Sequence, residues 1–282
     1  MHVEESSAYY AAISRRSVDR NEASARILPV GDAIAEPGPE DGAGAAADEA
    51  PPGFAALYQR LRTGVLRGEL APGSVVSQVQ LARQYKISRA PLREALRMLQ
   101  YEGLVDAEPG RRSRIALVGA ADLEELYAQR IVLEALAIRL TVPHLDARRI
   151  DALGHVLDDM EAASSTGSFE AWEAPHRAFH RGLVADGGAR LLATIEVLSE
   201  HAERYRRIFL TRPRAWSLAA SEHAAILEAC RDGDAREAAS RLAAHYATTA
   251  LTVCAALDPE HEPTRVRESL RLVREAGSGR DA

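Results

Sequence analysis

The sequence predicts a mainly α-helical protein, in which an N-terminal winged helix-turn-helix of three helices and a small β wing precedes an all-helical antiparallel bundle of about six helices. Residues 54–118 support the first part, because three short helical patterns precede two extended runs there. Residues 119–258 support the second part, because six long amphipathic patterns alternate with turn signals and almost nothing is typical of a strand. The 282 residues are enough for two domains of this size.

The first two helices of the N-terminal domain are expected over residues 54–68 and 78–85, on either side of a Pro72-Gly73 turn. The third helix is expected after Ser88, whose hydroxyl is suited to accept a hydrogen bond from the first free amides. Pro91 then falls in the first turn, where a missing N–H costs little. The last two of these helices complete a helix-turn-helix.

The third helix has two different faces. Apolar residues recur at helical spacing on the face expected to pack inward, and these are Leu92, Ala95, Leu96 and Leu99. Arg89, Arg93 and Arg97, four residues apart, form a separate cationic stripe. A helix that packs with one face and presents arginines on the other is typical of DNA recognition, and phosphates also suit its N-terminus.

A two-stranded wing with a basic tip is expected after the third helix. Gly103 ends the helix, and the extended run that begins at Leu104 reaches a Glu108-Pro109-Gly110 turn with glycine third, as a type II turn favours. The chain then returns through residues 111–114 into the apolar run 115–118. The tip of the wing therefore contains Gly110, Arg111 and Arg112.

The net charge of −6 is divided unevenly along the chain. Residues 54–118 contain eleven Lys and Arg against five Asp and Glu, a net charge of +6, whereas residues 1–53 contain four against ten, a net charge of −6. The remaining residues are also acidic, with a net charge of −6. This division is expected if the N-terminal domain neutralises DNA phosphates, although charge alone also fits a solvated face.

Residues 54–118 resemble the winged helix-turn-helix of the GntR family of bacterial transcription regulators, because SRAPLREALRMLQYEGLV is close to that family's signature. The resemblance implies that Arg89 and Arg93 contact bases and phosphates, that Ser88 contacts a phosphate, and that the wing tip enters the minor groove. Val79 and Arg112 depart from residues common in the family, which affects the operator sequence that is read. The predicted DNA-binding residues are Ser88, Arg89, Arg93, Arg97, Gly110, Arg111 and Arg112.

Two segments are expected to lie outside the folded domains, an acidic disordered tail at 1–53 and a flexible tail at 259–282. The first is rich in Ala, Gly, Pro and acidic residues and cannot form a core. No apolar run typical of a signal peptide or long enough for a membrane span occurs in the chain. The two cysteines, Cys230 and Cys254, lie in apolar helical patterns and favour buried thiols in a reducing cytoplasm.

Four histidines lie within the helical patterns of the predicted bundle. Its six helices are expected over residues 121–143, 146–164, 168–186, 189–210, 214–231 and 234–257. His176 and His180 stand at i and i+4 on one helix, and His223 and His245 lie on the last two. Four imidazoles delivered into a bundle interior would bind a divalent metal ion, whereas isolated histidines would be solvated or satisfied core residues.

Residues 119–258 resemble the all-helical FCD effector domain of the FadR-type branch of the GntR family. In metal-binding members the ligands come from a D-x-x-F-H motif and from one histidine on each of the last two helices. By this resemblance Phe179 and His180 match the motif, His223 and His245 supply the other two ligands, and His176 replaces the aspartate. An all-imidazole set suits zinc or nickel, and the missing negative charge favours anion binding.

The resemblance further implies that the bundle binds a small organic or sugar acid, with Arg130 holding its carboxylate. The alternative is that Arg130 forms an ion pair with Glu134 one turn later. Effector binding would shift helices near 119–123 and so change how two winged helices of a homodimer fit a palindromic operator. The sequence thus predicts a ligand-responsive, DNA-binding repressor.

Two alternatives differ from this prediction in the role of the bundle. The bundle would be a metal-free dimerisation scaffold if its histidines are solvated or structural. It would be a zinc-dependent hydrolase if a general base stood beside the metal, but Glu222 points about 100° away from His223 around the helix and no H-E-x-x-H motif occurs. We therefore expect no enzyme activity.

Overall fold

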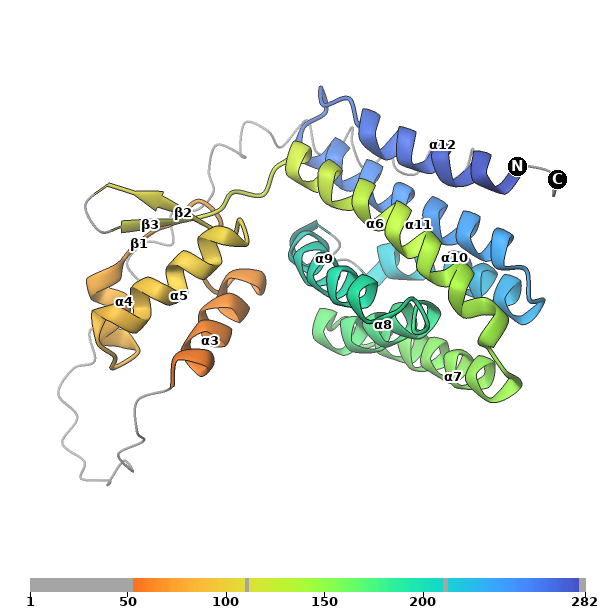
Figure 1. Cartoon of the computed structure of the whole chain (residues 1–282), viewed down its shortest axis with the longest axis horizontal. Helices are drawn as coiled ribbons and strands as arrows, with labels where there is room; N and C mark the ends of the chain where they lie inside the picture. The colour runs from red at the N-terminus through yellow and green to blue at the C-terminus, as the bar shows by residue number, and fades with distance from the viewer. Residues whose placement is uncertain (1–52, 110–111, 210–212, 279–282) are drawn as a thin grey trace. The chain divides into compact units, whose positions relative to one another are not determined.

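The computed structural model describes residues 53–109, 112–209 and 213–278, which fold into two compact units (Figure 1). One unit takes in residues 75–113 with the first part of the helix that starts at Phe54. The other contains residues 114–278 with 62–74. The predicted tail at 1–53 lies almost entirely outside the described residues, as do Gly110 and Arg111 of the wing tip.

The N-terminal elements are three helices and a small sheet, α3 (Phe54–Leu66), β1 (Val75–Ser77), α4 (Gln78–Gln84), α5 (Arg89–Tyr101), β2 (Val105–Glu108) and β3 (Arg112–Ile115). The sheet has the order β1-β3-β2, in which β2 and β3 are the two predicted strands of the wing and β1 is a third strand that was not predicted. The N–H of Ile115 donates to the carbonyl of Ser74 at 2.9 Å, and the N–H of Gly73 donates to the carbonyl of Ile115 at 2.8 Å. The segment before α4 thereby becomes an edge strand.

Helix α5 has the two faces that the sequence predicts. Its apolar residues Leu92, Ala95, Leu96 and Leu99 are buried. Gly103, with φ of +71°, follows the helix in the left-handed conformation that a glycine adopts without strain. One detail of the prediction was wrong: Ser88 occupies the N-cap position, but its side chain accepts no capping hydrogen bond among the described residues.

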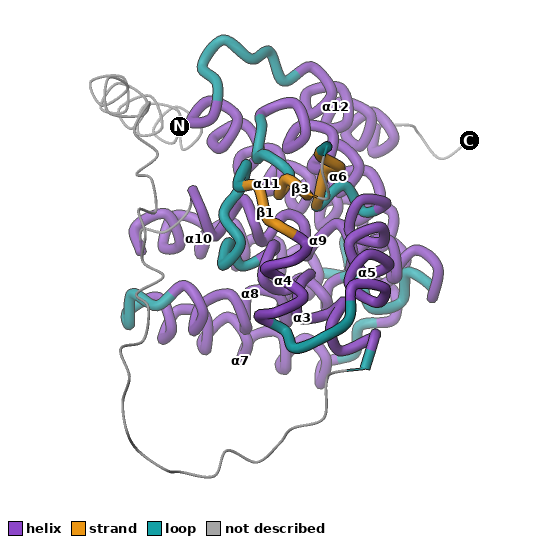
Figure 2. Tube along the Cα trace, turned by 90° about the vertical axis from the view of Figure 1, so that its left-hand side faces the viewer, coloured by secondary structure: helices purple, strands orange, loops and turns teal. Residues whose placement is uncertain are grey.

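The C-terminal unit consists of antiparallel helices around one apolar core. Its elements are α6 (Ala120–Thr141), the 3-10 turn η1 (Val142–His144), α7 (Ala147–Ser164), α8 (Phe169–Leu183), α9 (Ala189–Phe209), α10 (Pro213–Arg231), α11 (Ala235–Leu257) and α12 (Thr264–Ser278). Helix α6 packs against α9, α11 and α12, while α7 packs against α8 and α10. Figure 2 shows that strands are confined to the small sheet (orange) and that helices (purple) make up the rest of the regular structure. The predicted fold class is confirmed.

Polar side chains set the starts of several bundle helices. Asp146 accepts a hydrogen bond from the N–H of Arg149 at 2.8 Å before α7, and Ser168 accepts one from the N–H of Ala171 at 3.2 Å before α8. Asp234 does the same before α11. These caps fix where α8 and α11 begin, and therefore which of their side chains face the interior.

The expectation of a flexible tail after residue 258 was wrong for 264–278, which form α12 (Figure 1). Val266 is fully buried, and Leu270 and Val273 pack against the core at helical spacing from it. This apolar stripe is only three residues wide among many Arg and Glu, a pattern that is also typical of a solvated segment. The described part of the bundle therefore has seven α-helices where about six were predicted.

Candidate metal centre

Four buried histidines converge inside the bundle. His176 and His180 come from α8, His223 from α10 and His245 from α11, and one ligand atom of each lies within 4.8 Å of the others. The i, i+4 spacing places the two α8 rings 4.5 Å apart between centroids, and the rings of His223 and His245 are also 4.5 Å apart. The structure thus brings together all four residues that the sequence predicted, and their burial contradicts the alternative of solvated histidines.

Burial favours the neutral form of three of these imidazoles, those of His176, His180 and His223. Burial lowers the pKa of His176 to about 4, despite the opposing charge of Glu173. Burial and neighbouring histidine charges hold the pKa of His180 and His223 well below the ordinary value of 6.5. A neutral imidazole has the free lone pair that a metal ligand needs.

Several ring nitrogens of the cluster have no hydrogen-bond partner within the described residues. They are Nδ1 of His176, Nε2 of His180 and both nitrogens of His223. Each buried polar atom left without a partner costs about 1–3 kcal/mol, so a fully satisfied structural core does not account for the group. A divalent cation bound among these nitrogens would satisfy one nitrogen of each ring and remove part of that cost, and the donor set fits zinc or nickel.

Two residues that were not predicted for this role lie against the candidate ligands. Nδ1 of His245 lies 2.7 Å from a carboxylate oxygen of Glu222, and Nδ1 of His180 lies 3.0 Å from the hydroxyl of Tyr246. The Tyr246 hydroxyl donates at 2.5 Å to Glu134, so it accepts from His180 and leaves Nε2 of that ring facing the cluster. Such outer contacts are usual for metal-binding histidines. Glu222 is held against His245, and this is not the position of a general base.

Both roles considered for Arg130 are compatible with its environment. Its Nε donates to Glu134 at 2.8 Å, as the ion-pair alternative predicts. Its guanidinium also lies 4.2 Å from the ring centroid of Tyr246. Its Nη1, however, is buried without a partner in the described part of the chain. Burial alone would lower the pKa of Arg130, but the charge of Glu134 and its other neighbours raise the pKa by more than burial lowers it. The side chain is therefore a cation with one free donor.

A second buried ion pair lies beside His176. Arg206 of α9 donates to Glu173 of α8 at 2.5 Å and 3.3 Å, and a carboxylate oxygen of Glu173 lies 3.6 Å from Nδ1 of His176. Burial raises the pKa of Glu173, but Arg206 lowers it more, so the carboxylate is charged. Helix periodicity indicates only that α9 has an inward face, and this explains why the sequence did not reveal the pair.

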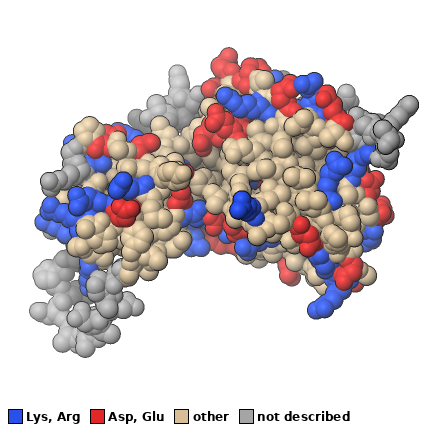
Figure 3. Space-filling model, viewed as in Figure 1, with Lys and Arg blue, Asp and Glu red and all other residues tan. Residues whose placement is uncertain are grey.

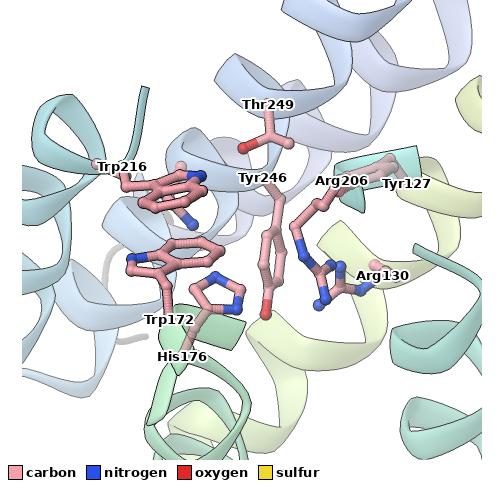
Figure 4. A pocket seen from close by; sticks show the side chains of 10 residues that line it. Tyr127, Arg130, Trp172, His176, Arg206, Trp216, Tyr246 and Thr249 are labelled. Carbon is pink, nitrogen blue, oxygen red and sulfur yellow. The ribbon is translucent and has the colours of Figure 1, made fainter. Parts of the chain in front are cut away.

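A small cavity of about 30 Å³ lies between these groups (Figure 4). Trp172 and Trp216 lie on one side of it, and Arg130 and Arg206 lie on the other, with Tyr246 between them. His176 and His245 also line it. The cavity therefore joins two candidate metal ligands to two cationic side chains, an arrangement suited to an anion that coordinates a metal.

The predicted DNA-binding residues within the described chain are on the surface. Ser88, Arg89, Arg93, Arg97 and Arg112 are all exposed. Arg97 forms an exposed ion pair with Glu94 at 3.4 Å. Figure 3 shows Lys and Arg side chains gathered over the α4–α5 end of this unit. The cationic stripe on α5 is thus free of core packing.

Family models match both parts of the chain. The bacterial regulatory proteins of the gntR family match residues 55–115, and the FCD domain matches residues 125–248. The chain is 30% identical over 197 residues to the HTH-type transcriptional regulator BphR of Paraburkholderia xenovorans, covering 67% of this chain and 80% of that protein. It is 32% identical over 160 residues to the transcriptional repressor GlaR of Escherichia coli, covering 55% of this chain and 73% of that protein.

A solved structure has the same fold. E. coli McbR/YncC aligns with a TM-score of 0.61 and 22% identity, over 71% of this chain and 96% of that chain. These relatives are transcriptional regulators and not enzymes, which contradicts the hydrolase alternative. Within the described residues, no helix is both long enough and apolar enough to cross a membrane.

Proposed function

The chain belongs to the GntR family of bacterial transcriptional regulators and carries an FCD domain, and from that premise we propose that it is a repressor controlled by a metal-dependent carboxylate sensor. The observation that carries this proposal is the cluster of four buried histidines beside a free donor of Arg130. The winged helix-turn-helix binds a palindromic operator as part of a homodimer.

In this proposal His176, His180, His223 and His245 hold a divalent cation, either zinc or nickel. The bound cation supplies a positive, Lewis-acidic centre to which a carboxylate oxygen coordinates. Glu222 and Tyr246 fix two of the imidazole rings so that their free nitrogens face the cluster. Rings that are already oriented lose little conformational entropy on binding.

Arg130 binds the effector carboxylate through Nη1 while its Nε stays paired with Glu134. A carboxylate that bridges metal and guanidinium satisfies a buried donor that has no other partner among the described residues. The nearby Arg206 is paired with Glu173 and adds to the positive potential of the cavity. The effector class that fits is a small organic acid.

Helix α9 gives a physical route from the cavity to the start of the bundle. Arg206 forms an ion pair with Glu173 beside the cavity. The hydroxyl of the adjacent Tyr205 donates a hydrogen bond to Asp122 and lies 3.4 Å from both the backbone N and the backbone O of Gly119. A ligand that changes the Arg206–Glu173 pair would therefore displace the segment that leads into α6. The two arrangements must differ in effector affinity for this to act as a switch.

The first test measures metal content. We expect about one zinc or nickel ion per chain by elemental analysis, and we expect a double variant, His180→Ala with His223→Ala, to lose it. His144 and His155 are exposed and outside the cluster, so the double variant His144→Ala with His155→Ala is the matched control. Wild-type protein that stays metal-free after incubation with either ion contradicts the proposal.

The second test separates the metal from the effector. A thermal-shift panel of small carboxylates and sugar acids, run with and without chelation, should show stabilisation that chelation abolishes, because a ligand of the native state raises its melting temperature. Arg130→Gln alone leaves Glu134 buried without its partner, so the informative variant is Arg130→Gln combined with Glu134→Gln. It should keep the metal and lose the carboxylate response. An unchanged response shows that Arg130 does not bind the effector.

A further inference from the structure

A second and larger cavity of about 460 Å³ lies between α7 and α10. Apolar side chains line much of it, among them Leu157, Met160 and Leu227. Trp172 and Trp216 form part of the wall of this outer cavity and also part of the wall of the small inner cavity. Their rings stack with centroids 5.4 Å apart and an interplanar angle of 13°. The two spaces therefore adjoin across the tryptophan pair.

The outer cavity also reaches the histidine cluster. His223 lines it, although this residue is fully buried and both of its ring nitrogens lack a partner within the described chain. Trp172 stacks on His176 at 4.4 Å between ring centroids. A molecule in the outer cavity would thus contact residues that touch or belong to the candidate metal centre.

The inner cavity is too small for a whole effector. Its volume of about 30 Å³ corresponds to roughly two water molecules. A carboxylate group can approach the cluster there, but the body of an acid larger than acetate needs other space. The adjoining outer cavity offers about fifteen times the volume of the inner one.

The described side chains at the rim of the outer cavity include more acidic than basic residues. Among the described residues that line it, Asp158, Glu161 and Glu228 are acidic and Arg231 is the one cation, which forms an exposed ion pair with Glu228. The rim therefore has excess negative charge, which disfavours a second carboxylate at the outer end of the ligand. An uncharged or cationic end is compatible with it, and the apolar walls favour an aromatic or other apolar body.

We infer that the effector is a monocarboxylic acid with an aromatic or apolar body, whose carboxylate faces the histidine cluster and whose body occupies the outer cavity against Trp172 and Trp216. This inference rests on the proposed function and narrows its effector class. It excludes dicarboxylates of similar length as tight ligands.

The chain has only these two tryptophans, so intrinsic tryptophan fluorescence reports directly on the walls of both cavities. Full-length, zinc-loaded protein is titrated with four probes, namely acetate, benzoate, 4-(aminomethyl)benzoate and terephthalate, and the affinities are checked by calorimetry. We expect benzoate and 4-(aminomethyl)benzoate to change the fluorescence and to bind at least about tenfold more tightly than terephthalate. Equal or tighter binding of terephthalate overturns the inference.

Two substitutions test the location. Ala224 is an exposed wall residue of the outer cavity, so Ala224→Phe fills that space without entering the core. It should weaken benzoate binding at least about tenfold and leave acetate and zinc binding unchanged, whereas Ala193→Phe, on the exposed face of α9, should change none of them. Glu161→Lys should restore terephthalate binding, and Asp151→Lys, elsewhere on α7, should not.

The possible failures can be told apart. One outcome is that benzoate binds Ala224→Phe as tightly as it binds the wild-type protein. Another is that the wild-type protein binds acetate and zinc but not benzoate. Either outcome shows that the outer cavity is not the effector site and leaves the proposed metal sensor intact. If zinc does not bind, the proposed function fails. The inference is overturned as well if, in that case, benzoate does not bind the wild-type protein or binds Ala224→Phe as tightly as the wild-type protein.

Discussion

Tyr246 connects the candidate metal centre to the candidate effector-binding arginine. Its hydroxyl accepts from Nδ1 of His180 and donates to Glu134, which in turn pairs with Nε of Arg130. The whole series is buried, so each contact is made in surroundings of low polarity where it is strong. Burial and the charge of Glu134 raise the pKa of Tyr246 well above 10, so the hydroxyl keeps the proton that it donates.

The substitution Tyr246→Phe tests this connection. It removes the partner of His180 Nδ1 while keeping the ring that stacks beside Arg130, so we expect zinc affinity to fall by about tenfold or more. The measurement is competition with a chelator of known affinity. Tyr101→Phe is the control, because Tyr101 is 96% exposed. Unchanged zinc affinity in Tyr246→Phe shows that the hydroxyl does not orient a ligand.

Local spacing made the histidines predictable and left their neighbours undetermined. His176 and His180 share a face at any rotation of α8, and the apolar patterns of α10 and α11 indicate that His223 and His245 point inward. The contacts of Glu222, Tyr246 and Arg206 depend on how far each helix is rotated about its axis. Periodicity fixes that rotation only to within a broad face, so these three residues were not predicted.

At the scale of elements, α5 presents a cationic face that packs against nothing in the core. Arg93 lies at its centre and is exposed. We expect Arg93→Ala to reduce operator affinity at least about tenfold, because a base-contacting arginine contributes about 1–3 kcal/mol. The slope of affinity against salt concentration should also decrease. The melting temperature should stay unchanged, since no core contact is removed.

Fluorescence anisotropy with a labelled duplex selected from a random library measures this effect. Arg139→Ala is the control, because Arg139 is exposed on α6 and the substitution removes the same charge outside the DNA-binding unit. If both variants lose operator affinity equally, general charge and not a recognition helix accounts for binding. If neither does, α5 is not the recognition helix.

Helix α12 is anchored by a buried carboxylate that the sequence did not indicate. Glu124 of α6 accepts from the N–H of Arg265 at 2.5 Å and from Nη1 of that residue at 3.2 Å, and it lies 2.9 Å from Nε2 of His261. A carboxylate near the first amides of a helix caps them and is favoured by the helix dipole. This long-range contact explains why a segment with a narrow apolar stripe folds onto the bundle.

Glu124→Gln should lower the free energy of local unfolding of α12 by about 1 kcal/mol, the usual contribution of a capping side chain. Burial raises the pKa of Glu124, but the hydrogen bonds from the Arg265 N–H and His261 lower the pKa by more than burial raises it. The pKa of Glu124 therefore lies below the ordinary value of 4.5. The contribution is therefore present above pH 4.5 and is lost as the pH falls through the lowered pKa. Hydrogen exchange of the α12 amides measures both effects. Glu125→Gln, an exposed neighbour, should change neither, and equal loosening in that variant contradicts the assignment.

The elements that the sequence did not predict share one cause. Strand β1 exists because residues 73 and 74 pair with Ile115, and α12 exists because Glu124 and the apolar core receive it. In both cases the contact that forms the element joins residues far apart in the sequence, and a local sequence pattern cannot predict such a contact. The long amphipathic helices α6 to α11 were predictable because their periodicity persists over many turns.

At the scale of the whole molecule, our proposal places DNA binding and effector sensing in separate parts of one chain. The basic winged helix-turn-helix carries a net charge of +6, whereas the chain as a whole carries −6. Operator binding as a two-fold pair needs a homodimer, which size-exclusion chromatography with light scattering detects directly. A monomer at micromolar concentration would remove the geometric basis of the switch.

If the bundle regulates the winged helix, the two binding sites share one coupling free energy. A carboxylate that weakens operator binding by some factor must itself bind the DNA complex more weakly by the same factor, because the two routes to the ternary complex have equal free energies. A coupling of about 1–3 kcal/mol corresponds to roughly 5–150-fold. Anisotropy with and without saturating effector measures one side of this cycle, and calorimetry of the effector with free and operator-bound protein measures the other. The double variant Arg130→Gln with Glu134→Gln should show a factor near one on both sides. A factor of one on both sides in the wild-type protein would show that the bundle does not regulate operator binding.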